Sequence, residues 1–173
     1  ARLRFLNCEV NQLRSLPPLP VALEELSCGH NYLTTFPTPL PPKLKSLSCN
    51  YNNLRRLPAL PRTLTFLQCS GQRNGMEELP ALHDTALVKL DCKRNGLRTI
   101  PSLPETLKRM KCSGNDLTSL PALPGGLEHL GCDDGLLDGV DLPQSLRTWK
   151  ELPRLGEESS DEAESSLSSG EAE

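Results

Sequence analysis

Apolar residues recur along this chain in a fixed phrase of about 20 residues, and not in the roughly 3.6-residue period of an amphipathic helix. The phrase reads L-x-x-L-x-C-x-x-N-x-L-x-x-L-P-x-L-P, and residues 107–126 contain a nearly complete copy. Its first half alternates apolar and polar positions, which is typical of a short strand with one buried face. Its second half carries prolines, which lack the backbone donor and fix φ, so a helix is excluded there. Each copy therefore predicts a short strand and an extended, polyproline-like return.

The phrase is repeated along nearly the whole chain. A spacing of about 20 residues with this consensus is the signature of leucine-rich repeats. We therefore expect a leucine-rich-repeat solenoid with a parallel β-sheet on its concave face, an extended, polyproline-like convex side and little helix. Seven copies begin at Leu3, Leu23, Leu44, Leu64, Leu87, Leu107 and Leu127, and an eighth starts at Leu146 and loses the pattern after Trp149.

Two positions of the phrase are explained by stacking, because the same position of successive parallel strands recurs about every 4.8 Å. Cysteine fits a buried ladder as a small, soft hydrophobe. Asparagine turns the chain and can bond backbone groups that no strand pairs. Repeat four is longer than the others, so we expect Asn74 to take its asparagine position, and in repeat seven Gly135 replaces the asparagine.

The cysteines do not form the pattern of a disulfide scaffold. Each repeat carries one, always at the same position, and their number is odd: Cys8, Cys28, Cys49, Cys69, Cys92, Cys112 and Cys132. We therefore expect free, buried thiols and a reducing compartment.

The composition changes after the repeats. We predict a leucine-rich-repeat domain over residues 1–155, with about seven repeats and a degenerate C-terminal capping repeat, and an acidic, Ser-rich disordered tail or linker over 156–173. Trp149 is expected to cover the open end of the core, with ligand stacking as the alternative. Seven acidic residues lie in 157–173, which leaves 15 acidic against 19 basic residues for the body. The chain has no initiating Met and enters a repeat already at Leu3, so we expect a fragment of a longer protein.

The motifs resemble a known family. The runs from Leu44 to Cys49 (LKSLSC), from Asn52 to Pro61 (NNLRRLPALP) and over 107–124 are similar to the LPX-type leucine-rich repeats of bacterial type III secretion effectors of the IpaH and YopM kind. The resemblance implies a target-recognition domain that binds a host protein, secreted by the bacterium and delivered to the host cytoplasm. Many members of that family add an E3 ubiquitin ligase domain with a catalytic cysteine. The resemblance therefore also allows a substrate-recognition arm whose ligase domain lies outside this chain.

Variable positions of the phrase should project from the strands onto the concave face and carry the binding function. Six basic residues of repeats five and six gather there, aromatic residues lie further along the same face, and acidic residues flank His129 in repeat seven. One interpretation is a solvated charged surface; the other is a face that binds an acidic protein, with a basic field and aromatic anchors. The candidate binding residues are Lys89, Lys93, Arg94, Lys108, Arg109, Lys111, Phe66, Tyr51 and His129.

Other chemistry is poorly supported by the sequence. Cys132-Asp133-Asp134 matches the spacing of the C-x-D nucleophile motif of the ligase family, but Cys132 occupies the buried cysteine position. The histidines lack partners at metal-ligand spacing, so no metal or cofactor is expected. No apolar run is long enough for a membrane span. A weak nucleic-acid or other polyanion binder stays open, although acids beside the basic residues work against phosphate tracking.

Overall fold

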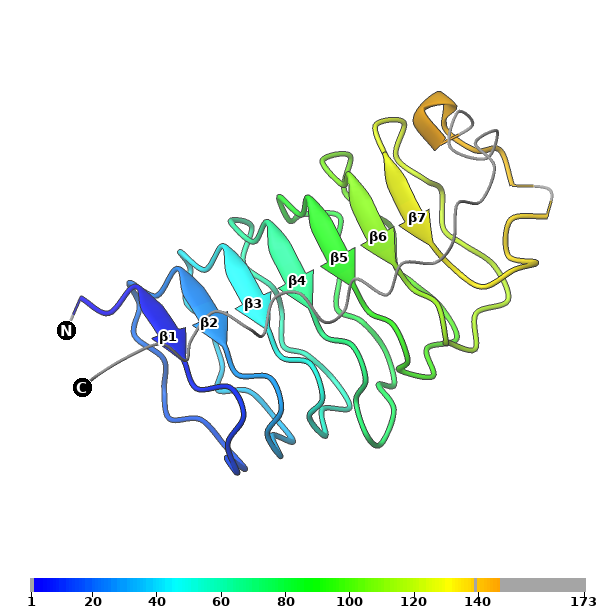
Figure 1. Cartoon of the computed structure of the whole chain (residues 1–173). Helices are drawn as coiled ribbons and strands as arrows, with labels where there is room; N and C mark the ends of the chain where they lie inside the picture. Colours follow the sequence, from blue (N-terminus) through cyan, green and yellow to red (C-terminus); the bar gives the residue numbers. More distant parts are fainter. Residues whose placement is uncertain (1, 139, 147–173) are drawn as a thin grey trace, which may run out of the picture.

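The computed structural model describes residues 2–138 and 140–146, and within them the chain winds into a parallel β-solenoid (Figure 1). Each turn contributes one three-residue strand, and all neighbouring strands pair in parallel in the order of the sequence. The fold class predicted from the repeats, a leucine-rich-repeat solenoid, is confirmed. The strands are β1 (Phe5–Asn7), β2 (Glu25–Ser27), β3 (Ser46–Ser48), β4 (Phe66–Gln68), β5 (Lys89–Asp91), β6 (Arg109–Lys111) and β7 (His129–Gly131).

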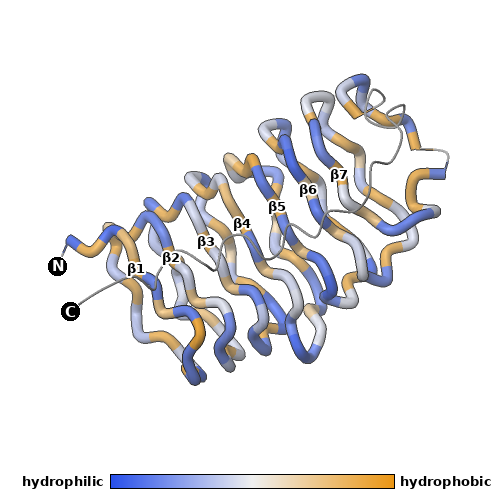
Figure 2. Tube along the Cα trace, in the orientation of Figure 1, coloured by the Kyte–Doolittle hydropathy of each residue, from blue (hydrophilic) through white to orange (hydrophobic). Residues whose placement is uncertain are grey.

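The core is a stack of equivalent residues. The central residue of each strand faces inward and lies in register with the next, as Leu47 does with Leu67. Both are fully buried, and so are Leu44 and Leu64, which begin their repeats. Hydrophobic and hydrophilic segments alternate along every turn (Figure 2). Burial of each Leu side chain contributes about 1.5–3 kcal/mol, so the repeated leucines supply most of the driving force for folding.

The return side is extended, as the prolines predict. Among the described residues the only helical turn is at 144–146. The prolines also set the start of the next turn, because a proline carbonyl accepts a hydrogen bond from the N–H of the first leucine of the following repeat. This bond, 2.9–3.1 Å long, joins Pro20 to Leu23, Pro41 to Leu44, Pro61 to Leu64, Pro104 to Leu107, Pro124 to Leu127 and Pro143 to Leu146.

The expected asparagine ladder is present. Asn52 is fully buried and donates through Nδ2 to the carbonyls of Cys28, Cys49 and Asn50 at 3.0–3.2 Å. Its Oδ1 accepts the N–H of Leu33 at 3.0 Å. The side chain thus pairs buried backbone groups of its own turn and the preceding one. The same bridging role is played by Asn31, Asn95 and Asn115.

In repeat four the ladder residue is Gln72, so the expectation for Asn74 is wrong. Gln72 is buried, its Oε1 accepts the N–H of Leu54 at 3.0 Å, and its Nε2 donates to the carbonyls of Cys49 and Cys69 at 3.0 and 3.1 Å. Asn74 is exposed. Gln72 stands three residues after Cys69, just as Asn52 stands three residues after Cys49, so the extra residues of this repeat come after the ladder position. The longer Gln side chain reaches the same backbone groups.

The cysteines are free, as expected. The five inner ones are buried, whereas Cys8 and Cys132 at the two ends are half-buried. Burial raises the pKa of the Cys28 and Cys112 thiols to about 12, and raises that of Cys69 well above its ordinary value. These thiols therefore serve as packing groups.

Leu146, which begins the eighth copy of the phrase, is buried and joins the core. The expected capping role of Trp149 and the predicted tail over 156–173 lie outside the described residues, and the division at residue 155 stays a prediction. In the described part of the chain, no helix is long and apolar enough to cross a membrane.

Candidate functional site

The sheet face consists of the strand positions on either side of the buried central residue. On this face Phe66, Lys89, Arg109 and His129 lie in register on β4 to β7, one residue from each strand. Parallel strands are about 4.8 Å apart, so the repeat architecture places these side chains side by side. The basic residues that the sequence assigned to one patch are therefore neighbours in space.

Two of the six cations that the sequence assigned to one patch form ion pairs. Lys93 Nζ lies 4.0 Å from Oδ2 of Asp91, and Lys108 Nζ lies 3.6 Å from Oε1 of Glu128. Lys108 also donates to the carbonyl of Gly126 at 3.0 Å. The remaining four cations form no ion pair with any residue in the described ranges. These four, which we call the basic patch, are Lys89, Arg94, Arg109 and Lys111.

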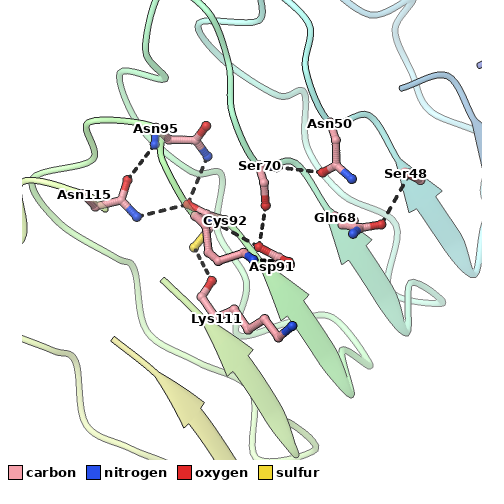
Figure 3. A network of polar contacts seen from close by, with 10 residues as sticks. Ser48, Asn50, Gln68, Ser70, Asp91, Cys92, Asn95, Lys111 and Asn115 are labelled. Atoms are coloured by element: carbon pink, nitrogen blue, oxygen red, sulfur yellow. Dashed lines mark hydrogen bonds and ion pairs between the residues drawn. The ribbon is translucent and has the colours of Figure 1, made fainter. Parts of the chain in front are cut away.

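Asp91 lies inside this region and is held by its own neighbours (Figure 3). One carboxylate oxygen accepts hydrogen bonds from the Ser70 hydroxyl and from the backbone N–H of Lys93. The Ser70 N–H in turn donates to Oδ1 of Asn50 at 2.8 Å. Asp91 is thus fixed toward β4 and Lys93, and it forms no ion pair with Lys111, its register neighbour on β6.

The two aromatic candidates occupy different places. Phe66 is half-buried on β4 beside Lys89. Tyr51 lies beyond the end of β3, on the rim of the sheet, where its ring stacks on His30 with the centroids 4.5 Å apart. Phe66 therefore borders the basic patch on the sheet face, whereas Tyr51 lies on the rim, two repeats away from Arg94, the rim residue of the patch.

The rim follows a rule that the sequence did not reveal. Its residues adopt a left-handed backbone, with φ of 52° at Tyr51 and 54° at Arg94. The repeat that follows Tyr51 has Gly71 at this position, and the repeat that follows Arg94 has Gly114. A Cβ at Gly71 would lie 2.7 Å from the Tyr51 ring, and one at Gly114 would lie 3.0 Å from Arg94 Cγ. Glycine thus suits the dihedral angle and also leaves room for the side chain of the preceding repeat. The sequence signal for this is limited to glycine at the eighth position of repeats four and six, Gly71 and Gly114.

A hollow of about 340 Å³ lies away from the basic patch and is lined in part by Asn53, Arg55, Arg56 and Glu77. Glu77 lies 2.9 Å from Nε of Arg56 and 3.7 Å from a guanidinium nitrogen of Arg55. Because its own carboxylate offsets its cations, this hollow has a weaker claim to bind a charged partner than the basic patch.

The cysteine chemistry expected of a ligase nucleophile is opposed by the environment of Cys132. Burial raises the pKa of its thiol, and the carboxylates of Asp133 and Asp134 raise it further. A thiolate nucleophile needs the opposite environment, a lowered pKa beside a base or a cation. Among the described residues, no group of three or more His, Cys, Asp and Glu side chains could hold a metal ion.

We expect alkylation of Cys132 in the native protein to be slower than that of a free thiol at pH 7, and to accelerate as the pH rises toward and above 9. The raised pKa keeps the sulfur protonated at neutral pH, and the thiolate is the reactive form. Iodoacetamide labelling followed by peptide mass spectrometry gives the rate, with Cys8, the half-buried cysteine at the other end of the ladder, as the control. A Cys132 that outpaces both Cys8 and free thiol at pH 7 would restore the catalytic interpretation.

Comparison with known proteins gives matches among solved structures. No family model matches the chain, and no curated protein matches it significantly. The chain is similar to YopM from Yersinia enterocolitica WA-314, with 32% identity and a TM-score of 0.66 over 83% of this chain and 36% of that one. It is also similar to YopM, a leucine-rich effector protein from Yersinia pestis, with 28% identity and a TM-score of 0.62 over 77% of this chain and 44% of that one. A Shigella effector LRR domain matches at 33% identity over 73% of this chain and 47% of that one, with a TM-score of 0.48.

The chain thus spans less than half the length of each of these structures. The similarity extends over the repeats, and it confirms the resemblance to the leucine-rich-repeat domains of bacterial effectors that the LPX motifs indicated.

Proposed function

Because this chain is a leucine-rich-repeat domain of the bacterial-effector type, we propose that it is the target-recognition module of an effector and binds a host protein through the concave face of its sheet. The observation that supports the proposal is the basic patch. Lys89 and Arg109 lie in register on adjacent strands, and Lys111 lies on the same strand as Arg109, two residues further on and on the same face. None of the three forms an ion pair with a described residue.

The patch has the properties of a recognition surface. Cations without a partner among the described residues stay available to an external one, whereas Lys93 and Lys108 are already engaged. A field of one sign accelerates association with an oppositely charged protein by roughly 10–1000-fold. Phe66 beside Lys89 supplies apolar contact area for the same partner. The partner is therefore a protein with an acidic surface.

The free thiols agree with action in a reducing compartment, which for a delivered effector is the host cytosol. An E3 ubiquitin ligase is a more specific form of the same proposal. The repeat domain then selects the protein to be modified, and the catalytic domain belongs to a part of the parent protein outside this chain.

A polyanion such as RNA is the competing ligand for a basic surface. Asp91 and Glu128 lie among the cations and repel a phosphate backbone, which needs a continuous basic track. A protein can instead place its acidic side chains at the basic patch and leave the neighbouring acids untouched.

Affinity capture tests the proposal. We expect the immobilised chain to retain a host-cell protein at physiological ionic strength, and the triple variant K89E/R109E/K111E to lose it, because three cations become anions. The variant R14E/R62E/R98E carries the same charge change on exposed residues outside the strands and should capture the protein as the wild type does. Equal capture by both variants would remove the basic patch from the proposal, and capture that nuclease treatment abolishes would favour the polyanion.

A further inference from the structure

We propose that the sheet face contains a subsite for a single oxyanion group of the partner, a carboxylate or a phosphate monoester, in the hollow between β6 and β7. The hollow has a volume of about 230 Å³ and is lined by Arg109, Met110, Lys111, His129, Leu130 and Gly131. This inference rests on the proposed function, because it specifies which chemical group of the protein partner the sheet face receives.

The hollow exists because one side chain is missing. Gly131 ends β7 at a position that carries a side chain in every other strand. Those equivalent residues are Asn7, Ser27, Ser48, Gln68, Asp91 and Lys111. A glycine in a strand weakens it and often marks a place where a ligand approaches the backbone closely. Gly131 has no positive φ that would explain the glycine by backbone conformation.

The missing side chain is surrounded by nitrogen donors. Arg109 pairs in register with His129, and Lys111 pairs in register with Gly131, so two cations and an imidazole border the same gap. All three side chains are exposed. None of them forms an ion pair with a residue in the described part of the chain.

The neighbouring acids are engaged elsewhere. Asp133 accepts the backbone N–H of Gly114 with both carboxylate oxygens at 2.9 Å. Glu128 faces Lys108 at 3.6 Å, and Asp91 is held by Ser70. Among the described residues, Arg109 and Lys111 thus place positive charge at the hollow, while Asp91, Glu128 and Asp133 are held by other groups.

The donor set matches an oxyanion. A guanidinium binds two oxygens of a carboxylate or a phosphate in a fixed fork, and an ammonium adds a charge that can be placed freely. An imidazole N–H supplies a further donor. The floor, formed by strand backbone and apolar atoms, admits one head group. A glutamate, aspartate or phosphoserine side chain can enter this hollow from a polypeptide lying across the strands.

Gly131→Leu tests the subsite without changing any charge. A Cβ at Gly131 would have its nearest neighbours at 3.7 Å, which is ordinary van der Waals contact, so we expect the variant to fold and to keep its melting temperature. The larger side chain fills the hollow. Ser27→Leu is the matched control, since Ser27 holds the same position on β2, remote from the hollow.

The probes are three synthetic peptides of the same length that carry a central phosphoserine, glutamate or glutamine. Titration of the ¹⁵N-labelled chain, followed by two-dimensional NMR, should show shifts at Gly131 and its neighbours with the two anionic peptides and none with the glutamine peptide. Gly131→Leu should weaken anionic binding at least tenfold, and Ser27→Leu should change it less than twofold. The tighter of the two anionic peptides identifies the group.

Unchanged binding to Gly131→Leu, or shifts that are equal for all three peptides, would overturn the subsite. The outcome is separable from that of the proposed function. If the captured host protein still binds Gly131→Leu but not K89E/R109E/K111E, the subsite is wrong and the proposed function stands. If it binds both variants, the subsite is wrong and the basic patch is removed from the proposed function.

Discussion

Replacing Gln72 by Ala should destabilise the domain by about 3 kcal/mol, whereas replacing Asn74 by Ala should change its stability by less than about 0.5 kcal/mol. Gln72 is buried and satisfies the N–H of Leu54 together with the carbonyls of Cys49 and Cys69. Truncation leaves the buried N–H of Leu54 without a partner, which costs about 1–3 kcal/mol, and removes one of the two side-chain donors at each carbonyl, where Asn52 and Asn95 remain. Asn74 is exposed.

The measurement is urea unfolding followed by circular dichroism, with the two variants and the wild type side by side. Asn52→Ala serves as a positive control, because Asn52 bridges two turns of the solenoid in the same way. Equal stability of the Gln72 and Asn74 variants, or a greater loss at Asn74, would show that the ladder of repeat four is formed differently.

The second large effect concerns the stacked core. Leu67→Ala should cost about 3–4 kcal/mol, because this side chain is fully buried between the equivalent residues of β3 and β5. Leu6→Ala removes the same atoms from the same position of β1, where the side chain is only half-buried. Its cost should be about half as large, since the residue pairs with one neighbouring strand instead of two.

Thermal and urea unfolding of the two leucine variants measure this difference directly. A solenoid derives its stability from nearest-neighbour contacts between repeats, so the position of a repeat in the stack decides the cost. Equal losses for Leu6→Ala and Leu67→Ala would contradict this account of the core.

The fold could be predicted from the sequence because each residue type that the fold requires recurs in several repeats. A leucine that must face inward, or a proline that excludes a helix, recurs at the same position in repeat after repeat. The role of Gln72 could not be predicted in this way, because the consensus residue at the ladder position is asparagine and Asn74 follows two residues later. The choice depends on which side chain reaches the buried carbonyls of Cys49 and Cys69, and that is a property of the folded backbone.

The candidate site was predictable in its position and not in its details. Strand alternation places Lys89, Arg109 and Lys111 outward in adjacent strands, as the structure shows. The engagement of Lys93 and Lys108 by carboxylates depends on side-chain conformations that a repeat pattern does not specify. The sequence did not indicate Gly131, because its proposed role depends on the absence of a side chain and not on a functional group.

The central claim is that Lys89, Arg109 and Lys111 on the sheet face, which form no ion pair within residues 2–138 and 140–146, bind an acidic protein. It is tested most directly by the affinity of the captured protein, measured by titration calorimetry, for the wild type, for K89E/R109E/K111E and for the matched control R14E/R62E/R98E. We predict an affinity at least about tenfold weaker for the sheet-face variant, and one within about twofold of the wild type for the control. Equal weakening in both variants would show that only the net charge matters, and an unchanged affinity of the sheet-face variant would contradict the claim.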